Sequence, residues 1–408
     1  MHVRWSPRRG KRLSPAAEEM SAGASDMSDT TSLQNAKRAK QDEFYTQYAD
    51  IQTEMNAYLE YDPDTFRGKT VLLPCDDPEW SNFTRYFAEN FTALGLRRLV
   101  STSYAPQTKK EKYGLDLFEW GEVEAARNAE DAKAGDSLCT LRSLRQEKGR
   151  ILVLDHDLTG DGKVNFEDIE WKYLDGDGDF RSDEVKKLRD EADVIVTNPP
   201  FSLFREFLAW IMEAGKEFAI IGNRNAITYK EVFPLIKANR IWLDNPFVRG
   251  AGYFKSPIEV DKKLSYYNSH DYREGLIRVP GVRWFTNLEH GRRHQPLQLM
   301  TVADNIKYSR HKEVKGIGYR KYDNYDAIEV PFTDAIPSDY DGIMGVPISF
   351  LDKYCPEQFE ILGMCASAGY DKRIVGLEFL GKGDARPLIG GKNTYARIFI
   401  RRKKGQVK

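Results

Sequence analysis

The alternation of apolar and polar positions predicts strands and helices that follow one another through the first half of the chain. Residues 194–196 (Val-Ile-Val) are a β-branched apolar run, which is typical of a strand buried on both faces. From 203 to 212 the apolar side chains recur at helical spacing, so a helix follows. The same order is predicted at 68–91 and 218–239, with a further strand at 151–157. This succession predicts an α/β fold with a mostly parallel, doubly wound sheet.

The two ends of the chain depart from this pattern. Residues 1–36 are rich in Ser, Ala, Lys and Arg and have no apolar periodicity, so we predict a disordered N-terminal extension. A short helix is expected at 35–59. Beyond residue 245 the predicted strands become shorter, more aromatic and punctuated by Gly and Pro. We therefore divide the chain into a first region, 37–245, with an acidic insertion at about 155–178, and a second, β-rich region, 246–408.

Composition narrows the class of protein. The 61 basic and 62 acidic residues give a net charge of −1, so a nucleic-acid surface would have to be a local patch. The four cysteines have no CxxC or metal-site spacing and indicate reduced thiols of a cytoplasmic protein. The sequence has neither an apolar run near 18 residues nor a signal peptide, which predicts a soluble protein without a membrane partner.

The turn Asn198-Pro199-Pro200-Phe201, between a predicted strand and a predicted helix, carries the strongest chemical signal. Its two prolines hold the turn stiff and donate no ladder hydrogen bonds. In open α/β sheets, ligands bind at the carboxyl ends of strands, where this turn would lie. The sequence therefore predicts a ligand site at this turn.

The residue types of the turn fit methyl transfer to an exocyclic amine. The N6 amine of adenine is a poor nucleophile, so a site must accept hydrogen bonds from both N–H groups and aim the nitrogen at the methyl donor. The Asn198 side-chain oxygen and the Pro199 carbonyl can accept these bonds, and Phe201 can stack on the base. A base inside a duplex must also be flipped out to reach such a pocket.

Several further segments, in this order along the chain, resemble the EcoRI-type adenine-specific DNA methyltransferases. The resemblance covers roughly residues 35–400 and includes the NPPF motif of S-adenosylmethionine-dependent amino-methyltransferases. The segments that carry it are DEFYT (42–46), VLLPCDDPEWSNF (71–83), GDGDFRS (176–182), VTNPPFSLFRE (196–206), IIGNRNAITYKE (220–231), WFTNL (284–288), YDNYDAI (322–328) and DYDGIMGVPISFLDKYCPEQFEI (339–361).

The resemblance implies S-adenosylmethionine as the methyl donor and Asn198–Phe201 as the catalytic motif. The cofactor contacts that it implies are Phe44, Tyr45, Thr46, Pro74, Cys75, Asp76, Asp77, Asp179 and Phe180. The chain departs from the usual pattern twice. The turn at 74–78 has no GxG, although its carboxylates could meet the cofactor's ammonium or ribose hydroxyls. The end of the second strand, LVSTSY (99–104), offers hydroxyls where an acidic residue is usual.

The resemblance also implies that the two regions have different functions. Region 37–245 would be a Rossmann-like catalytic domain, and region 246–408 would recognise the DNA target and return an aromatic strand, at about 282–300, to the catalytic core. Within it, Trp284 and Phe285 resemble the strand that packs beside the flipped base. Further DNA contacts are expected from Arg224, Asn225, Arg292 and Arg293, with His290, His294 and the basic run 307–315 as candidate phosphate contacts. The basic run 401–404 at the tail is either a solvated charged face, which is the usual role of such a run, or a further phosphate contact.

One acidic segment, DLTGDGKVNFED (157–168), fits a 12-residue calcium loop. Its last ligand would be Asp rather than the usual Glu, so the segment is either a structural calcium site or a solvated acidic turn. Methyl transfer from a sulfonium needs no metal. The predicted ligands are Asp157, Thr159, Asp161, the Lys163 carbonyl, Asn165 and Asp168.

The sequence predicts a methyltransferase that modifies adenine N6 in double-stranded DNA, as the modification enzyme of a restriction-modification system. Two alternatives stay open: the same transfer onto RNA adenine or a protein glutamine, and a catalytically silent DNA- or calcium-binding protein. A monomer in a bacterial or phage-infected cytoplasm is expected. A cognate endonuclease would share its site, with GAATTC a candidate, without forming a stable complex.

Overall fold

The computed structural model describes most of the first region and most of the second. The predicted extension 1–36 and the charged segment 105–147 lie outside the described residues. The described residues are 45–78, 81–104, 148–162, 164–244, 251–255, 276–365, 376–378, 380 and 385–403.

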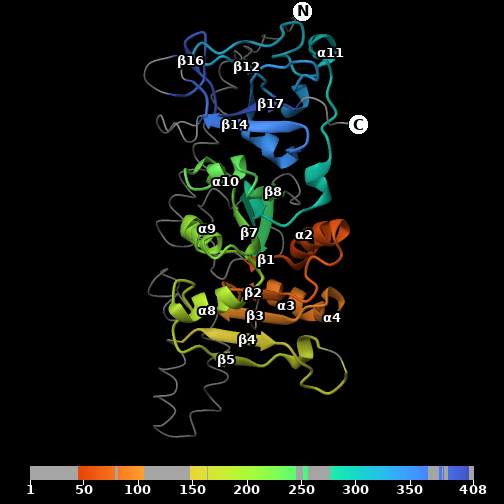
Figure 1. Cartoon of the computed structure of the whole chain (residues 1–408), viewed down its shortest axis with the longest axis vertical. Helices are drawn as coiled ribbons and strands as arrows, with labels where there is room; N and C mark the ends of the chain where they lie inside the picture. The colour runs from red at the N-terminus through yellow and green to blue at the C-terminus, as the bar shows by residue number, and fades with distance from the viewer. Residues whose placement is uncertain are drawn as a thin grey trace, which may run out of the picture.

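An eight-stranded sheet forms the centre of the molecule (Figure 1). Three of its seven neighbouring pairs are parallel, joining β3, β2, β6 and β7, and four are antiparallel. The strand order is β5 (Trp171–Tyr173), β4 (Arg150–Leu154), β3 (Arg98–Ser103), β2 (Thr70–Leu73), β6 (Val194–Thr197), β7 (Glu217–Asn223), β11 (Val282–Thr286) and β8 (Trp242–Asp244).

The prediction of a mostly parallel sheet was therefore wrong, and β4 shows why. The apolar pattern at 151–157 correctly marks a strand, but β4 runs antiparallel to β3, with Ile151 opposite Thr102. An apolar pattern reports that a segment is buried in a sheet, whereas the direction of pairing depends on the path of the connection. The short edge strand β5 also lies inside the segment expected to be an acidic loop.

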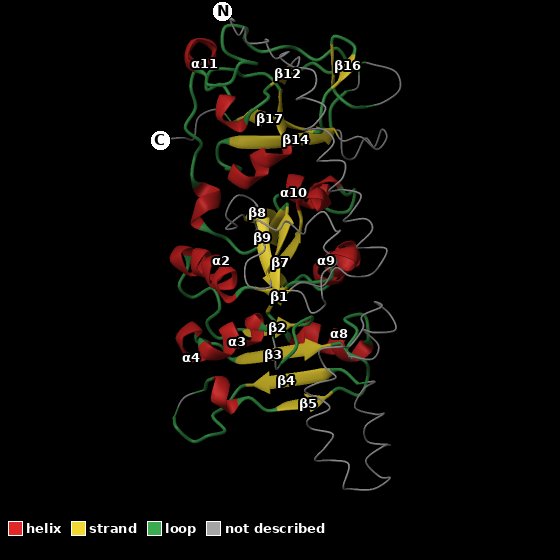
Figure 2. Ribbon diagram, turned by 180° about the vertical axis from the view of Figure 1, so that it is seen from behind, coloured by secondary structure: helices red, strands yellow, loops and turns green. Residues whose placement is uncertain are grey.

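The side chains of the central strands alternate between two cores, as strand geometry requires. On β6, Val194 and Val196 join one core, and Ile195 joins the other. Helices α2 (Tyr48–Tyr61), α3 (Asn82–Glu89) and α4 (Phe91–Leu94) cover the first face. Helices α8 (Asp183–Glu191), α9 (Phe204–Glu213) and α10 (Phe233–Lys237) cover the second, and Figure 2 shows the two groups on opposite sides of the strands.

Two of the predicted helices differ in extent from the observed ones. The first begins at Tyr48, where 35–59 was expected, and residues 35–44 lie outside the described part. The second, expected over 227–239, is divided into the end of the 3-10 turn η3 (Arg224–Thr228) and the short α10. The chain then turns at Asn239, which has a φ of 52° and so ends the helix.

The second region contains smaller sheets. Its largest has the order β12 (Ile328–Glu329), β13 (Met344–Pro347), β17 (Arg397–Arg402) and β14 (Phe359–Cys365). Most of its buried apolar residues belong to the same core as α9 and α10, so the two regions share a continuous core, whereas Cys365 and Phe399 belong to a smaller separate cluster. The remaining described elements are η1 (Phe166–Asp168), η2 (Phe201–Leu203), η5 (Gly291–His294), α11 (Val302–Tyr308), η6 (Thr333–Ala335), η7 (Ile348–Lys353) and the hairpin of β15 (Leu388–Ile389) and β16 (Lys392–Asn393).

A three-stranded sheet links the start of the described chain to its middle. Its order is β1 (Tyr45–Thr46), β9 (Ala251–Lys255) and β10 (Leu276–Pro280), and β10 turns through Gly281 directly into β11 of the central sheet. Among the described helices, none is long and apolar enough to cross a membrane.

Candidate active site

The candidate residues gather where the parallel strands of the central sheet end. The chain passes from β2 to β3 on one side, whereas β6 lies on the other side of β2. This reversal creates a crevice at the carboxyl ends of β2 and β6, which is where open α/β sheets bind ligands. The turn 74–77 follows β2 and the turn 198–201 follows β6, so the fold brings the two predicted motifs to one place.

The amide of Asn198 contacts the motif from the start of the chain. Its Nδ2 donates to Thr46 Oγ1 at 3.3 Å, across 152 residues of sequence. Thr46 is buried, and its carbonyl accepts from Asn82 Nδ2 at 2.8 Å, which fixes β1 against α3. Phe44 and the side chain of Tyr45 lie outside the described residues. The contact orients the Asn198 amide, because its nitrogen faces Thr46.

The rest of the NPPF turn is rigid and buried. Pro199 and Pro200 are buried, and Phe201 begins the turn η2 with only 4% of its surface exposed. Its ring belongs to the core beneath α2 and α3. Most of the Phe201 ring packs against protein, so only a small part of it could contact a base. The stacking of Phe201 on a base stays a prediction.

The turn after β2 contains two carboxylates in different environments. Asp76 is 6% exposed, and its carboxylate accepts hydrogen bonds from the hydroxyls of Ser81 and Thr197. Asp77 is more accessible and lies 3.7 Å from the Arg150 guanidinium. Asp77 is therefore the better placed of the two for a ligand, whereas Asp76 is engaged by the protein.

The turn also contains Pro74 and Cys75, the other two residues predicted to contact the cofactor. The carbonyl of Pro74 accepts from Thr102 Oγ1 at 3.3 Å, which joins the turn to β3. Cys75 is half-buried. Sequence reasoning did not single out Thr102, because a threonine at a strand end carries no distinctive signal.

The GDGDF segment packs closely on the end of β3. A Cβ built on Gly178 would lie 2.3 Å from the Ser103 carbonyl oxygen, and the φ of Gly178 is 79°, so this position requires glycine. The close approach brings Asp179 to Tyr104, whose hydroxyl donates to its carboxylate at 3.3 Å. Arg181 also forms a bidentate pair with Asp179, at 2.9 and 2.6 Å. Asp179 thus lies at the same edge as the two turns.

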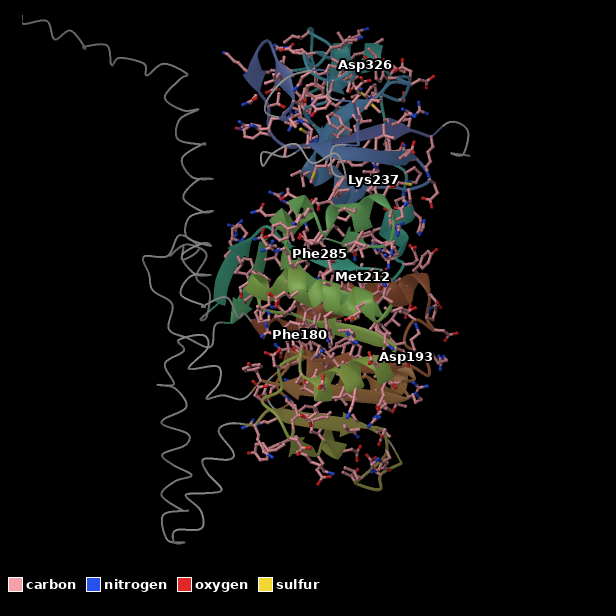
Figure 3. The ribbon with its side chains drawn as sticks, turned by 60° about the vertical axis from the view of Figure 1, so that its left-hand side comes forward. Phe180, Asp193, Met212, Lys237, Phe285 and Asp326 are labelled. Atoms are coloured by element: carbon pink, nitrogen blue, oxygen red, sulfur yellow. The ribbon has the colours of Figure 1, made fainter. Side chains whose placement is uncertain are left out.

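Phe180 and Phe285 lie inside the molecule, beside α9 (Figure 3). Phe180 is 5% exposed and packs edge-on against Phe207 at 5.1 Å, and Phe285 is fully buried at 4.9 Å from Phe204. Trp284, the neighbour of Phe285, is also fully buried. The expectation that Trp284 and Phe285 contact DNA is therefore wrong for this structure, because neither side chain reaches the surface.

Two pairs of neighbouring residues among the predicted DNA contacts, Arg224 with Asn225 and Arg292 with Arg293, lie in different surroundings. Arg224 and Asn225 are exposed directly after β7, at the edge that carries the candidate site. Arg293 is buried, with its guanidinium 3.6 Å from the centre of the Trp242 ring, so its role as a phosphate contact is a wrong prediction. Arg292 is partly exposed and pairs with Asp244 at 2.9 Å.

A buried polar cluster beside α2 was not anticipated from the sequence. Glu54 is fully buried and accepts from the Tyr58 hydroxyl, and burial, together with the charge of Asp244, holds the pKa of Glu54 well above its usual range. Burial, aided by the nearby Arg292, lowers the pKa of His290 to about 3. A neutral, 2% exposed His290 cannot serve as the phosphate contact predicted for it.

In the segment predicted to bind calcium, the first carboxylate accepts hydrogen bonds from the loop itself. Asp157 accepts from the backbone N–H groups of Gly160 and Gly162 at 2.6 and 2.7 Å, and from Thr159 Oγ1 at 3.3 Å. Calcium ligands would instead direct their oxygens at one shared point. No group of three His, Cys, Asp or Glu side chains that could hold a metal ion occurs among the described residues, which include every predicted ligand except Lys163.

The last carboxylate of the loop is used in the same way. Asp168 accepts from the N–H groups of Leu158 and Thr159, both at 2.8 Å, and from Asn165 at 2.9 Å. These backbone donors lower the pKa of Asp168 to about 2. The carboxylates of Asp157 and Asp168 thus accept hydrogen bonds from the loop's own backbone, and the predicted calcium site is not supported.

We expect calcium and chelator to leave the thermal stability of the protein unchanged. A structural site at a calcium concentration 100 times its Kd would add ~2.7 kcal/mol to the free energy of unfolding, enough to raise Tm by several degrees. Thermal unfolding in millimolar CaCl2, in EDTA and in MgCl2 checks this. A calcium-specific rise in Tm that Asp157→Asn removes would show that the loop does bind the ion.

Comparisons with known proteins find relatives that match the chain over most of its length. A family model described as adenine-specific methyltransferase EcoRI matches residues 32–403. The chain is 39% identical to the Type II methyltransferase M.EcoRI of Escherichia coli, over 92% of this chain and 97% of that protein. It is 32% identical to M.MpnI of Mycoplasma pneumoniae, over 91% and 98%, and 29% identical to M.MgeORF184P of Mycoplasma genitalium, over 90% and 97%. No solved structure matches significantly.

Proposed function

Because the chain belongs to the EcoRI family of adenine-specific methyltransferases, we propose that it methylates adenine N6 in double-stranded DNA at the edge where β2 and β6 end. The activity itself, adenine-specific methyl transfer of the Type II kind, follows from the family and from relatives matched over nearly their whole length. The place of catalysis, the target atom and the residue roles are the proposal.

One observation carries the placement of catalysis at Asn198. The turn after β6 meets β1 through the bond from Asn198 Nδ2 to Thr46 Oγ1, so two motifs distant in sequence converge beside the switch point of the sheet. Residues that meet in this way at the carboxyl ends of parallel strands form the usual ligand site of such a sheet. The central strands β3, β2, β6 and β7, all parallel, support a Rossmann-like methyltransferase domain.

The residues of the turn can hold the target amine. With its nitrogen on Thr46, the Asn198 amide offers its oxygen Oδ1 as an acceptor for one N–H of the adenine amine. Proline residues cannot continue a ladder, so the Pro199 carbonyl is suited to accept the other. Two acceptors on one nitrogen draw its lone pair out of the ring and fix its direction, which is a positioning and electrostatic effect. Phe201 would then border the base.

The edge also fits S-adenosylmethionine, which supplies an electrophilic methyl group on a sulfonium. Asp77 and Asp179 place carboxylates at the ends of β2 and β3, where they can meet ammonium or hydroxyl groups. Both are ion-paired with arginines, so a bound cofactor would share or displace Arg150 and Arg181. We therefore retain Asp77 and Asp179 as cofactor contacts, with Thr46.

Region 246–408 is proposed to recognise the DNA target. The exposed pair Arg224 and Asn225 at the catalytic edge is suited to contact the duplex beside the flipped base. A monomeric state and a separate endonuclease for the same site stay predictions.

The experiment is transfer of labelled methyl from S-adenosylmethionine to unmethylated duplex DNA, with structured RNA and bulk protein as parallel acceptors. We expect label on DNA, recovered as N6-methyladenine at a defined sequence. DNA that is already methylated at that sequence is the control and should accept no label. Label on RNA or protein alone would refute the DNA assignment while leaving the amine chemistry intact.

A further inference from the structure

The buried carboxylate of Asp76 connects the turn after β2 to the residue that precedes Asn198. Its Oδ2 accepts from Thr197 Oγ1 at 2.5 Å, and its Oδ1 accepts from Ser81 Oγ at 2.7 Å. Thr197 is the last residue of β6, and Ser81 caps the N-terminus of α3 through Phe83. One carboxylate therefore joins the cofactor turn, the catalytic turn and a helix start.

The backbone of Asp76 is held as firmly as its side chain. Its N–H donates to the Thr102 carbonyl at 3.0 Å, and its carbonyl accepts from Ser101 Oγ at 2.6 Å. Both partners lie on β3. Asp76 thus has little freedom to turn toward a ligand, and its 6% exposure agrees with this.

Thr197 occupies a position where an apolar residue would suffice for packing. The three residues before it on β6 are all apolar and fully buried, and Thr197 is fully buried as well. Valine has nearly the same shape, and a buried hydroxyl is costly unless it forms a hydrogen bond. The hydroxyl is therefore best explained by its bond to Asp76, which fixes the end of β6 relative to the turn after β2.

We propose that Asp76 and Thr197 form a positioning clamp that sets the Asn198 amide at the correct distance and angle from the cofactor turn. The inference rests on the proposed function. Neither residue touches the reacting atoms: Asp76 acts on Thr197, and Thr197 acts through the peptide that leads to Asn198. The assignment replaces the cofactor contact predicted for Asp76, and it gives a structural role to a turn that lacks the usual glycine-rich loop.

The clamp matters because methyl transfer depends on alignment. The amine nitrogen, the methyl carbon and the sulfur must lie nearly in line, and a displacement of about 1 Å can lower a rate by ~10²-fold. Asn198 is held from one side by Thr46 Oγ1 and from the other by the backbone of Thr197. Removal of the Thr197 hydroxyl would loosen the second attachment without removing any group of the proposed amine site.

The test compares Thr197→Val, which keeps the shape of the side chain, with Thr197→Ser, which keeps the hydroxyl. The matched control is Thr286→Val on β11, another fully buried threonine whose hydroxyl donates, to the Phe218 carbonyl at 2.7 Å. Single-turnover methyl transfer to duplex DNA and the Kd for S-adenosylmethionine are measured for the full-length chain and each variant. Thr197→Ala serves the same comparison if Thr197→Val does not fold.

We expect Thr197→Val to slow single-turnover transfer by about 10- to 100-fold while the Kd stays within about threefold. Thr197→Ser and Thr286→Val should remain near the wild-type rate. A Thr197→Val rate within about threefold of wild type, or a Thr197→Ser rate as low as that of Thr197→Val, overturns the clamp. If the wild-type chain itself transfers no methyl to DNA, the proposed function is refuted, and the inference that rests on it is refuted as well.

Discussion

Substitution Asn198→Ala is expected to lower the rate of methyl transfer to DNA by at least about 10²–10³-fold, with binding of S-adenosylmethionine nearly unchanged. The side chain would lose the acceptor that orients one N–H of the adenine amine, and this interaction matters most as the nitrogen becomes tetrahedral. The Thr46 hydroxyl, which accepts from Asn198 Nδ2, remains in place. Single-turnover transfer and cofactor titration, measured together, separate the two effects.

Asn198→Asp provides the closest control. A carboxylate retains an acceptor for the amine but cannot donate to Thr46 Oγ1, so we expect a rate between those of the wild type and Asn198→Ala. Equal loss in both variants would mean that the bond to Thr46, rather than the acceptor, limits the rate. An Asn198→Ala protein that methylates DNA at the wild-type rate would remove Asn198 from the mechanism.

Local elements of the fold could be read from the sequence because their signals are local. The apolar run of β6, the stiff turn and α9 all occur as expected, since a continuous β-branched run followed by apolar residues at a period of 3.6 is recognisable without knowledge of neighbouring elements. The direction of β4 could not be read in this way. Its side chains are those of a buried strand whichever way it runs, and its partner β3 lies across a long connection.

The motifs of the site were visible in the sequence, whereas the contacts that organise them were not. Asn198 and Thr46 were predicted from family motifs, and the structure places them in contact. Ser81 and Thr197 were missed, because hydroxyl residues of this kind occur at helix starts and strand ends throughout proteins. Only the fold shows that both hydroxyls point at one carboxylate, that of Asp76.

The wrong DNA contacts have a related cause. Arginines and aromatic residues suit a DNA surface and a protein core equally well, so residue type alone cannot decide between them. Arg293 stacks on Trp242 in the interior, and Trp284 packs edge-on against Phe83 at 6.0 Å. Burial follows from register: Trp284 lies between Ile221 of β7 and Asp244 of β8, in the interior of the sheet.

Loss of one partner of a buried ion pair in the second region is expected to lower the stability of the protein strongly. Glu329 on β12 and Arg397 on β17 lie on strands separated by β13, and the guanidinium contacts both carboxylate oxygens, at 2.5 to 3.1 Å. The Tyr322 hydroxyl donates to the same carboxylate. Gly345 of β13 leaves the space for that tyrosine, since a Cβ there would collide with its ring.

Glu329→Ala should lower the free energy of unfolding by about 3–5 kcal/mol, because it leaves the Arg397 guanidinium buried without its carboxylate. The double variant Glu329→Leu with Arg397→Met should be nearly neutral, since it removes both charges and fills their space. Urea unfolding followed by circular dichroism measures both. If Glu329→Ala lowers the free energy of unfolding by less than about 1 kcal/mol, water must reach the Arg397 guanidinium, and the pair is not a buried one. If the double variant is as unstable as the single one, the polar network itself, with Tyr322, holds β12 and β17 in register across β13.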